Sequence, residues 1–144
     1  MKENLYKELK QKHQEEVNNF PMFFAFSQNQ FDEGMKKIGL EASDTDKIYS
    51  LGGGGFYKKS DAEALHEMFE RHEKEMESKI KTDTTGEGFI YDMFKYELNN
   101  HEYSYTGEIG DTLDCLGLTI EDVNSNKDLI HGLNKACKDI SNIE

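Results

Sequence analysis

The sequence is poor in several residue types whose scarcity is informative. It contains one proline, no tryptophan, two cysteines and a single arginine, Arg71, among 144 residues. No apolar run approaches the roughly 20 residues that a helix needs to cross a membrane. The two cysteines show no CxxC spacing, so neither a disulfide framework nor a zinc motif is indicated. These absences argue against a disulfide-rich or membrane-spanning protein.

The cysteines and the N-terminal residues both favour a reducing compartment. Cys115 and Cys137 lie among leucines and isoleucine, which predicts two buried thiols that stay reduced. A disulfide between them is the alternative, since sequence spacing does not exclude it. The first residues, MKENLYKELKQKHQEEV, are charged throughout, unlike a signal peptide. We therefore expect a cytoplasmic protein.

The apolar content is sufficient for a folded domain. Hydrophobic residues make up 35% of the chain and include nine Phe and seven Tyr, which is too rich for a disordered acidic tail. A chain of this length suits one domain with one core. We expect a single domain over residues 1–144. A charged helix over residues 1–18 should pack loosely on it, because its apolar stripe consists of Leu5, Leu9 and Val17.

Negative charge is unevenly distributed along the chain. The formal net charge is −12, and residues 82–144 hold four lysines against thirteen carboxylates. Such a surface repels phosphate backbones and attracts basic clefts, because its field extends over roughly 8–10 Å at physiological salt. We therefore expect no direct contact with nucleic acid, and we expect a basic protein as the partner.

Three short segments have the character of strands. Residues 22–26 form a continuous apolar run rich in phenylalanine, which predicts a strand buried on both faces at the centre of a sheet. Residues 47–51 and 56–57 flank a glycine turn and predict a hairpin. The fold class that follows is α+β: a helix-rich domain with a small, mostly antiparallel sheet of about three short strands.

Helix-capping signals divide the rest of the chain. Ser27 with Gln30 predicts a capping box and a helix that ends at Gly39. Ser60 with Glu63 predicts a second capping box and a helix to about residue 81. Periodic apolar residues predict further helices over 89–98, 111–116, from 119, and over 129–140, with an irregular stretch at 103–110.

One loop combines glycines with lysines: Gly52, Gly53, Gly54, Gly55, Lys58 and Lys59. It is one substitution away from the phosphate-binding pattern G-x-x-x-x-G-K-[ST], because Lys58 occupies the place of the last glycine. That glycine lets the backbone wrap around phosphates. A wide hairpin turn with glycines at positive φ is therefore the favoured interpretation. The alternative is a site for a small anionic metabolite or nucleotide.

Two groups of polar residues could in principle hold a metal or carry a proton. His66 and Glu70 lie one helical turn apart, but the HExxH pattern needs a histidine at position 70, so a solvated acidic face is favoured. His101 could carry a proton, with Glu97 or Glu102 as its orienting carboxylate. No nucleophile is apparent beside it, so a buried hydrogen-bond network is favoured. We expect no enzyme, no metal and no cofactor.

Five runs carry a resemblance to known proteins: residues 18–27 (NNFPMFFAFS), 48–56 (IYSLGGGGF), 60–69 (SDAEALHEMF), 100–103 (NHEY) and 116–123 (LGLTIEDV). They resemble uncharacterised small acidic proteins of phages and other mobile elements in Gram-positive bacteria. The resemblance implies a mobile-element context inside a host cell, and no catalytic residue. Small acidic phage proteins often occupy the nucleic-acid channel of a host defence nuclease, so the analogy favours an anti-CRISPR-like inhibitor.

The favoured function is therefore a non-catalytic acidic interaction protein that inhibits a host defence protein, such as a CRISPR nuclease, by occupying a basic nucleic-acid-binding cleft. The alternative is a binder, or sponge, of a small anionic metabolite that uses the Gly52–Gly55 loop. The candidate contact residues for a basic partner lie close in sequence with no lysine among them: Glu102, Glu108, Asp111, Asp114, Glu121 and Asp122.

Overall fold

The computed structural model describes residues 3–141, and residues 1–2 and 142–144 are left undescribed. It contains three strands, eight α-helices and two 3-10 turns within that range. The helices and turns are α1 (Leu5–Asn19), α2 (Gln28–Lys37), η1 (Thr45–Lys47), η2 (Lys59–Asp61), α3 (Ala62–Thr82), α4 (Phe89–Asn100), α5 (Tyr103–Thr106), α6 (Gly110–Leu116), α7 (Ile120–Asn124) and α8 (Lys127–Ser141).

Two compact units divide the chain, and each is described by itself. The first comprises Met1–Gln14 with Lys74–Glu144, and the second comprises Glu15–Glu73. Helices α1 and α3 each contribute residues to both units. The predicted class, a helix-rich α+β fold with three short antiparallel strands, is confirmed. Among the helices of residues 3–141, none combines the length and the apolar character that crossing a membrane requires.

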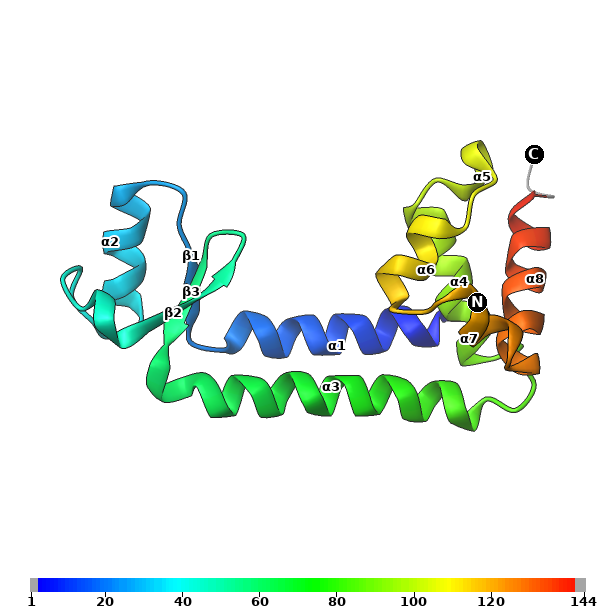
Figure 1. Cartoon of the computed structure of the whole chain (residues 1–144), viewed down its shortest axis with the longest axis horizontal. Coiled ribbons are helices and arrows are strands. Elements are labelled where there is room, and N and C mark those ends of the chain that lie inside the picture. The colour runs from blue at the N-terminus through cyan, green and yellow to red at the C-terminus, as the bar shows by residue number, and fades with distance from the viewer. Residues whose placement is uncertain (1–2, 142–144) are drawn as a thin grey trace. The chain divides into compact units, whose positions relative to one another are not determined.

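A three-stranded sheet forms the middle of the second unit (Figure 1). Its strands are β1 (Met22–Phe24), β2 (Ile48–Gly52) and β3 (Gly55–Lys58), and both pairings are antiparallel in the order β1-β3-β2. The predicted hairpin is therefore confirmed. The predicted central position of residues 22–26 is wrong, because β3 pairs with both β1 and β2 and is itself the central strand. Phe24 and Phe26, at 57% and 79% exposure, lie largely uncovered.

Each face of this sheet has its own apolar cluster. On one face Phe23 packs with Met35 of α2 and with Ile38, which follows the end of that helix. The contact is close, because a Cβ on Gly34 would lie 2.1 Å from the Phe23 ring. On the other face Met22 packs with Leu65 and Met68 of α3.

The helix starts in this unit match the sequence signals only in part. The hydroxyl of Ser27 accepts a hydrogen bond from the Gln30 N–H at 3.2 Å, as a capping box predicts. The Gln30 side chain instead accepts from the Phe26 N–H at 2.7 Å. The prediction of a second capping box, at Ser60, is wrong. Ser60 lies inside the 3-10 turn η2, because β3 runs to Lys58 and the chain turns before α3 begins.

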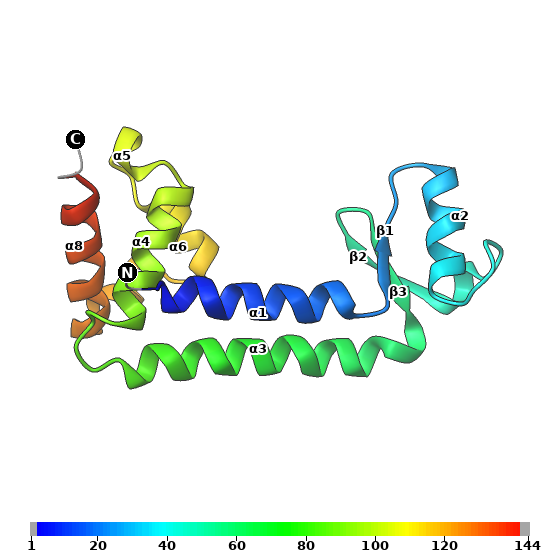
Figure 2. The same cartoon turned by 180° about the vertical axis from the view of Figure 1, so that it is seen from behind.

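Helices α4 and α8 pack together in the core of the first unit (Figure 2). Four apolar α4 side chains are fully buried, namely Ile90, Met93, Phe94 and Leu98, and they share one cluster with Leu133 and Ala136 of α8. The predicted helices over 89–98, 111–116, from 119 and over 129–140 are all present, and the stretch predicted to be irregular contains the short helix α5.

The start of α1 is better anchored than its sequence predicts. Tyr6 and Leu9 are buried at 4% and 8% exposure and join the core of the first unit, whereas Leu5 is 46% exposed. The prediction overlooked Tyr6, whose polar end needs a partner as well as apolar contact. The cysteine prediction is wrong for Cys115, which is exposed on α6, although both thiols are free.

Candidate functional site

The predicted contact residues all lie on the surface of the first unit. We call them the acidic surface: Glu102, Glu108, Asp111, Asp114, Glu121 and Asp122, every one of them exposed. They follow the helices α5, α6 and α7, in a stretch, residues 96–126, that has no lysine or arginine. Within residues 3–141, none of the six takes part in an ion pair. Their charges are therefore not neutralised by neighbouring cations.

Local structure fixes the backbone that carries these carboxylates. Glu102 has φ 58°, a left-handed conformation that a non-glycine residue adopts only when its surroundings enforce it. Asp111 lies in the first turn of α6, where a negative charge is favourable beside the helix dipole. The buried side chains of Thr112 and Leu113 hold the same helix to the core.

Asp122 has a structural role as well as an exposed charge. It completes a capping box at α7, accepting from the Thr119 N–H at 2.9 Å while the Thr119 hydroxyl accepts from the Asp122 N–H at 3.0 Å. The backbone hydrogen bond from Thr119 lowers the pKa of the Asp122 carboxyl. The cap begins the helix that was predicted from residue 119. It also makes Asp122 a poor position for a test of partner binding.

One carboxylate of the same stretch, Glu97, is fully buried and paired. Its side chain accepts hydrogen bonds from the Tyr6 hydroxyl, from Lys10 Nζ at 2.9 Å and from Asn100 Nδ2 at 3.1 Å. The Cys115 Sγ lies 3.7 Å from the same carboxylate. Burial raises the pKa of Glu97, but the three hydrogen bonds outweigh it, so the pKa is held below the usual range of glutamate.

These contacts make Glu97 a structural anchor between α1 and α4. The pKa of Tyr6 is raised by burial and by its hydrogen bond to Glu97, so the phenol stays protonated as a donor. His101, predicted as a possible proton carrier, has Nδ1 2.8 Å from the main-chain oxygen of Glu97. The less favoured alternative, in which the Glu97 carboxylate orients His101, does not match this contact, because that carboxylate accepts from Tyr6, Lys10 and Asn100.

The glycine loop forms the predicted turn. Gly52, Gly53 and Gly54 have φ of 82°, 57° and 84°, values that favour glycine. Gly55 belongs to β3. Both lysines contact neighbours in their own unit: Lys58 Nζ lies 3.9 Å from the Asp61 carboxylate, and Lys59 Nζ lies 5.1 Å from the centre of the Tyr49 ring. A phosphate-binding helix start does not follow the loop directly, since η2 lies between β3 and α3.

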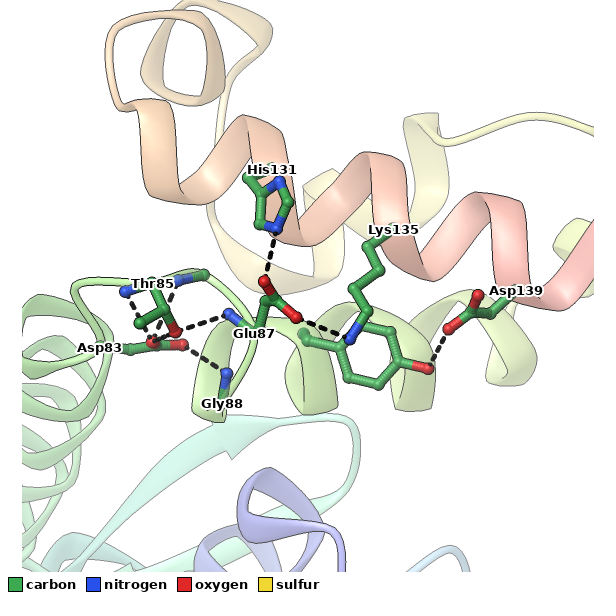
Figure 3. Close-up of polar contacts among 9 residues, drawn as sticks. Asp83, Thr85, Glu87, Gly88, His131, Lys135 and Asp139 are labelled. Carbon is green, nitrogen blue, oxygen red and sulfur yellow. Dashed lines mark hydrogen bonds and ion pairs between the residues drawn. The ribbon is translucent and has the colours of Figure 1, made fainter.

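A polar cluster that was not predicted joins the α3–α4 loop to α8, as Figure 3 shows. Asp83 accepts hydrogen bonds from four backbone N–H groups, those of Thr85, Gly86, Gly88 and Ile90, at 3.0 to 3.2 Å. These bonds close the loop tightly and position the start of α4. The spacing Asp83-x-Thr85-Gly86-x-Gly88 was the available signal, since aspartate and glycine favour turns.

Glu87 at the end of this loop joins it to α8. Its carboxylate lies 3.2 Å from His131 Nε2 and 3.1 Å from Lys135 Nζ, and these contacts, Lys135 first, lower its pKa (Figure 3). The Tyr91 hydroxyl donates to Asp139 at 2.6 Å, and burial together with this bond raises the pKa of Tyr91 to about 12. The cluster pairs its charges internally and leaves no base beside a nucleophile.

Other candidates for chemistry are incomplete within the described residues. His66 Nε2 lies 3.9 Å from Glu70 on an exposed face, as the solvated interpretation predicts. No group of three metal-binding side chains converges anywhere in residues 3–141. A hollow of about 560 Å³ in the first unit is lined by Leu5, Leu9 and Phe89 with Lys12 and Lys79 among its charged residues.

Comparison with known proteins places the chain in a family but does not extend to an activity. No curated protein and no solved structure matches the sequence. A family of unknown function, DUF7659, matches residues 5–139, which include the acidic surface, the glycine loop and Glu97. With this match over nearly its whole length, the chain belongs to the DUF7659 family.

Proposed function

We propose that this protein is a non-catalytic interaction protein whose acidic surface occupies a basic nucleic-acid-binding cleft of a partner protein. One observation carries the proposal: six carboxylates are exposed on α5 to α7, and none of them forms an ion pair within the described residues. Elsewhere the described surface carries ion pairs, as at Glu16 with Arg71 and at Glu87 with Lys135. The acidic surface is distinguished by its sequence context, because residues 96–126 contain no lysine or arginine that could pair with it.

Such a surface suits association with a cationic cleft. Unscreened charge accelerates encounter with an oppositely charged partner, and the effect falls as salt rises. The helices beneath the carboxylates are held by buried Leu113 and Val123, so the charges are presented on an ordered backbone. Asp122 excepted, the carboxylates have little part in local structure, which leaves them available for a partner.

The partner that we propose is a basic protein, such as a CRISPR nuclease or another host defence nuclease, in the cytoplasm of a bacterial host. The support is the resemblance to small acidic proteins of mobile elements together with the charge of the acidic surface. Phosphate-binding clefts recognise regularly spaced negative charge, which carboxylates can imitate. Direct binding of nucleic acid is not expected for a chain of net charge −12.

The test is an affinity capture from a Gram-positive bacterial lysate with three forms of the protein. They are the wild type, the reversal of Glu108, Asp111 and Asp114 to lysine, and a matched reversal of three exposed carboxylates outside the acidic surface, Glu33, Glu63 and Glu67. Both reversals change the net charge equally. We expect a basic protein that is retained by the wild type and the matched control, lost with the acidic-surface variant, and released by added DNA or by high salt.

Two outcomes would contradict the proposal. One is equal capture by both reversals, which would show that only total charge matters. The other is a captured protein that DNA does not displace. Each variant must first unfold at a denaturant concentration close to that of the wild type, since exposed charges contribute little to stability, typically 0–1 kcal/mol.

A small-anion site at the glycine loop is the second candidate. One observation favours it: a Cβ on Gly52 or Gly53 would meet no atom within 4 Å, so the backbone there is open to a ligand. Against it, Lys58 and Lys59 already contact Asp61 and Tyr49.

A further inference from the structure

We propose that the free edge of β2 binds a short, extended, acidic segment of another protein, which adds to the sheet as a fourth strand. This site is in the second unit and is separate from the acidic surface. It is built from an apolar face, an open strand edge and three lysines at the ends of β2 and β3.

The apolar face consists of four exposed side chains around the hairpin: Phe24, Phe26, Tyr49 and Leu51, at 57%, 79%, 46% and 39% exposure. A contiguous exposed apolar patch on a folded protein typically marks an interaction site. Three of them gather around the glycine turn, because a Cβ on Gly55 would lie 2.9 Å from the Phe24 ring and 3.2 Å from Leu51, and a Cβ on Gly54 would lie 2.6 Å from the Phe26 ring. Tyr49 packs beside Tyr57, with ring centres 5.8 Å apart.

The sequence explains why this part of the sheet lacks a cover. Met22 and Tyr57 share a face with Phe24 and Tyr49, because side chains alternate along a strand and these residues are in register. Leu65 and Met68 of α3 cover Met22 and Tyr57. The rest of the same face, beyond Tyr57 toward the glycine turn, is left exposed.

The edge of β2 is open for pairing. The Ala25 N–H donates to the Gly54 carbonyl at 2.9 Å, so the alternation of an antiparallel ladder makes Phe23 and Phe56 a hydrogen-bonded pair. Phe56 then directs its backbone groups toward β1, and Tyr57 directs its groups toward Tyr49 of β2.

By the same alternation, Ile48 and Ser50 direct their N–H and C=O groups away from the sheet. Four of the five residues of β2 are exposed, so nothing in the described chain covers this edge. Outward peptide groups of this kind are the template on which extended segments add to a sheet.

The exposed area favours a short segment over a second copy of the chain. Aromatic side chains present roughly 150–250 Å² each, so the four residues at their exposed fractions offer on the order of 400 Å². A stable interface between two folded proteins buries roughly 800 Å² on each partner. The apolar face supplies about half of that, and backbone hydrogen bonds to a single strand supply the remaining affinity.

The lysines beside β2 favour an acidic segment. Residues 47–59 contain three lysines, Lys47, Lys58 and Lys59, and no carboxylate, in a chain whose net charge is −12. Lys47 and Lys58 have partners in Asp44 and Asp61, whereas the described contact of Lys59 is with the Tyr49 ring beside the edge. A segment that alternates apolar residues with aspartate or glutamate therefore complements the site, and a basic segment does not.

The experiment is a selection from a displayed library of random peptides of about ten residues, long enough for one strand. Selection on the wild type is followed by measurement of each enriched peptide on two variants. Ser50→Pro removes the outward N–H, which an edge strand tolerates. Ser50→Ala keeps the N–H but, like Ser50→Pro, loses the hydroxyl that accepts from the Gly52 N–H, so it is the matched control.

We expect the enriched peptides to alternate apolar and acidic residues. They should bind Ser50→Pro roughly tenfold more weakly than the wild type, because one backbone hydrogen bond is lost. Their affinity for Ser50→Ala should equal that for the wild type. If Ser50→Pro does not fold, Phe24→Lys and Leu51→Lys serve in its place, because both side chains are exposed and both lysines would oppose an apolar segment. Amide chemical shifts of Ile48 and Ser50 should move on binding.

Three results would overturn the proposal. The first is a selection without an enriched pattern, or with peptides that bind Ser50→Pro as tightly as Ser50→Ala. The second is a dimer in sedimentation that Leu51→Lys dissociates, which would make a second copy the occupant. The third is binding to vesicles of anionic phospholipid that Phe24→Lys abolishes, which would make a membrane surface the occupant.

Discussion

The ammonium group of Lys10 lies 2.9 Å from the Glu97 carboxylate, although 87 residues separate the two in sequence. Glu97 is fully buried, and the hydroxyl of Tyr6 donates to the same oxygen. An ionised carboxylate in a protein interior is unfavourable unless it is paired and hydrogen-bonded. Helix α1 therefore supplies the groups that make the burial of Glu97 possible, and the pair ties the N-terminal residues to α4.

We expect Lys10→Met to destabilise the protein by about 1–3 kcal/mol, because it leaves the buried carboxylate with fewer donors. Glu97→Ala should cost more, about 3–5 kcal/mol, since it leaves the buried Tyr6 hydroxyl without its acceptor and opens a cavity. Urea unfolding at neutral pH measures both. The control is Lys7→Met on the exposed side of α1, for which a change within about 0.5 kcal/mol is expected. Equal effects of Lys7→Met and Lys10→Met would contradict the role given to Glu97.

The same pair makes a prediction about pH. The folded pKa of Glu97 lies below the unfolded value of about 4.5, because the hydrogen bonds from Tyr6, Lys10 and Asn100 outweigh burial. The stabilisation is therefore fully present above pH 4.5 and is lost as the pH falls through the folded pKa. The stability difference between wild type and Glu97→Gln should shrink below pH 4.5. A difference that stays constant from pH 7 to the acid limit would show that Glu97 is not the group responsible.

Local signals predicted much of the first unit, and long-range contacts account for what they missed. Two helix ends depend only on neighbours within four residues: the capping box of Thr119 with Asp122, and the left-handed Gly117 that ends α6. The local sequence was therefore sufficient to predict where these helices begin and end. The role of Glu97 depends on Tyr6 and Lys10, and no local pattern joins them.

In the sheet, too, local signals predicted only the contacts between segments that are close in sequence. The hairpin of β2 and β3 is local and was predicted from the glycine run, whereas the place of β1 depends on which edge of the hairpin is free. An apolar run such as 22–26 indicates burial, but Phe24 and Phe26 are exposed because no described helix covers that part of the sheet. The exposure of the acidic surface followed from its composition alone.

We expect Gly132→Ala to destabilise the first unit by about 1–3 kcal/mol through overpacking. A Cβ at this position would lie 2.5 Å from Ile90 Cγ2 and 2.7 Å from the Gly86 carbonyl oxygen, so α8 could not approach α4 as closely. The control is Gly110→Ala in α6, where a Cβ meets no atom within 4 Å. That change should be neutral or stabilise by up to about 1 kcal/mol, since alanine favours helix. Thermal unfolding of both variants distinguishes close packing from a general intolerance of alanine.

The small-anion alternative makes a prediction that the partner proposal does not share. If Lys58 and Lys59 bind an anionic metabolite, such a ligand raises the melting temperature by mass action, and Lys58→Ala with Lys59→Ala abolishes the rise. The control removes two exposed lysines from α2, Lys36 and Lys37, and should leave the rise intact.

A thermal-shift screen of nucleotides and cyclic nucleotides supplies the measurement. A rise that survives in the Lys58 and Lys59 variant would place the ligand elsewhere. Absence of any rise at millimolar ligand would remove the sponge function and leave the loop as a turn, because Gly52, Gly53 and Gly54 already require glycine by their positive φ. The proposed binding of a basic partner would be unaffected, since the acidic surface uses none of these residues.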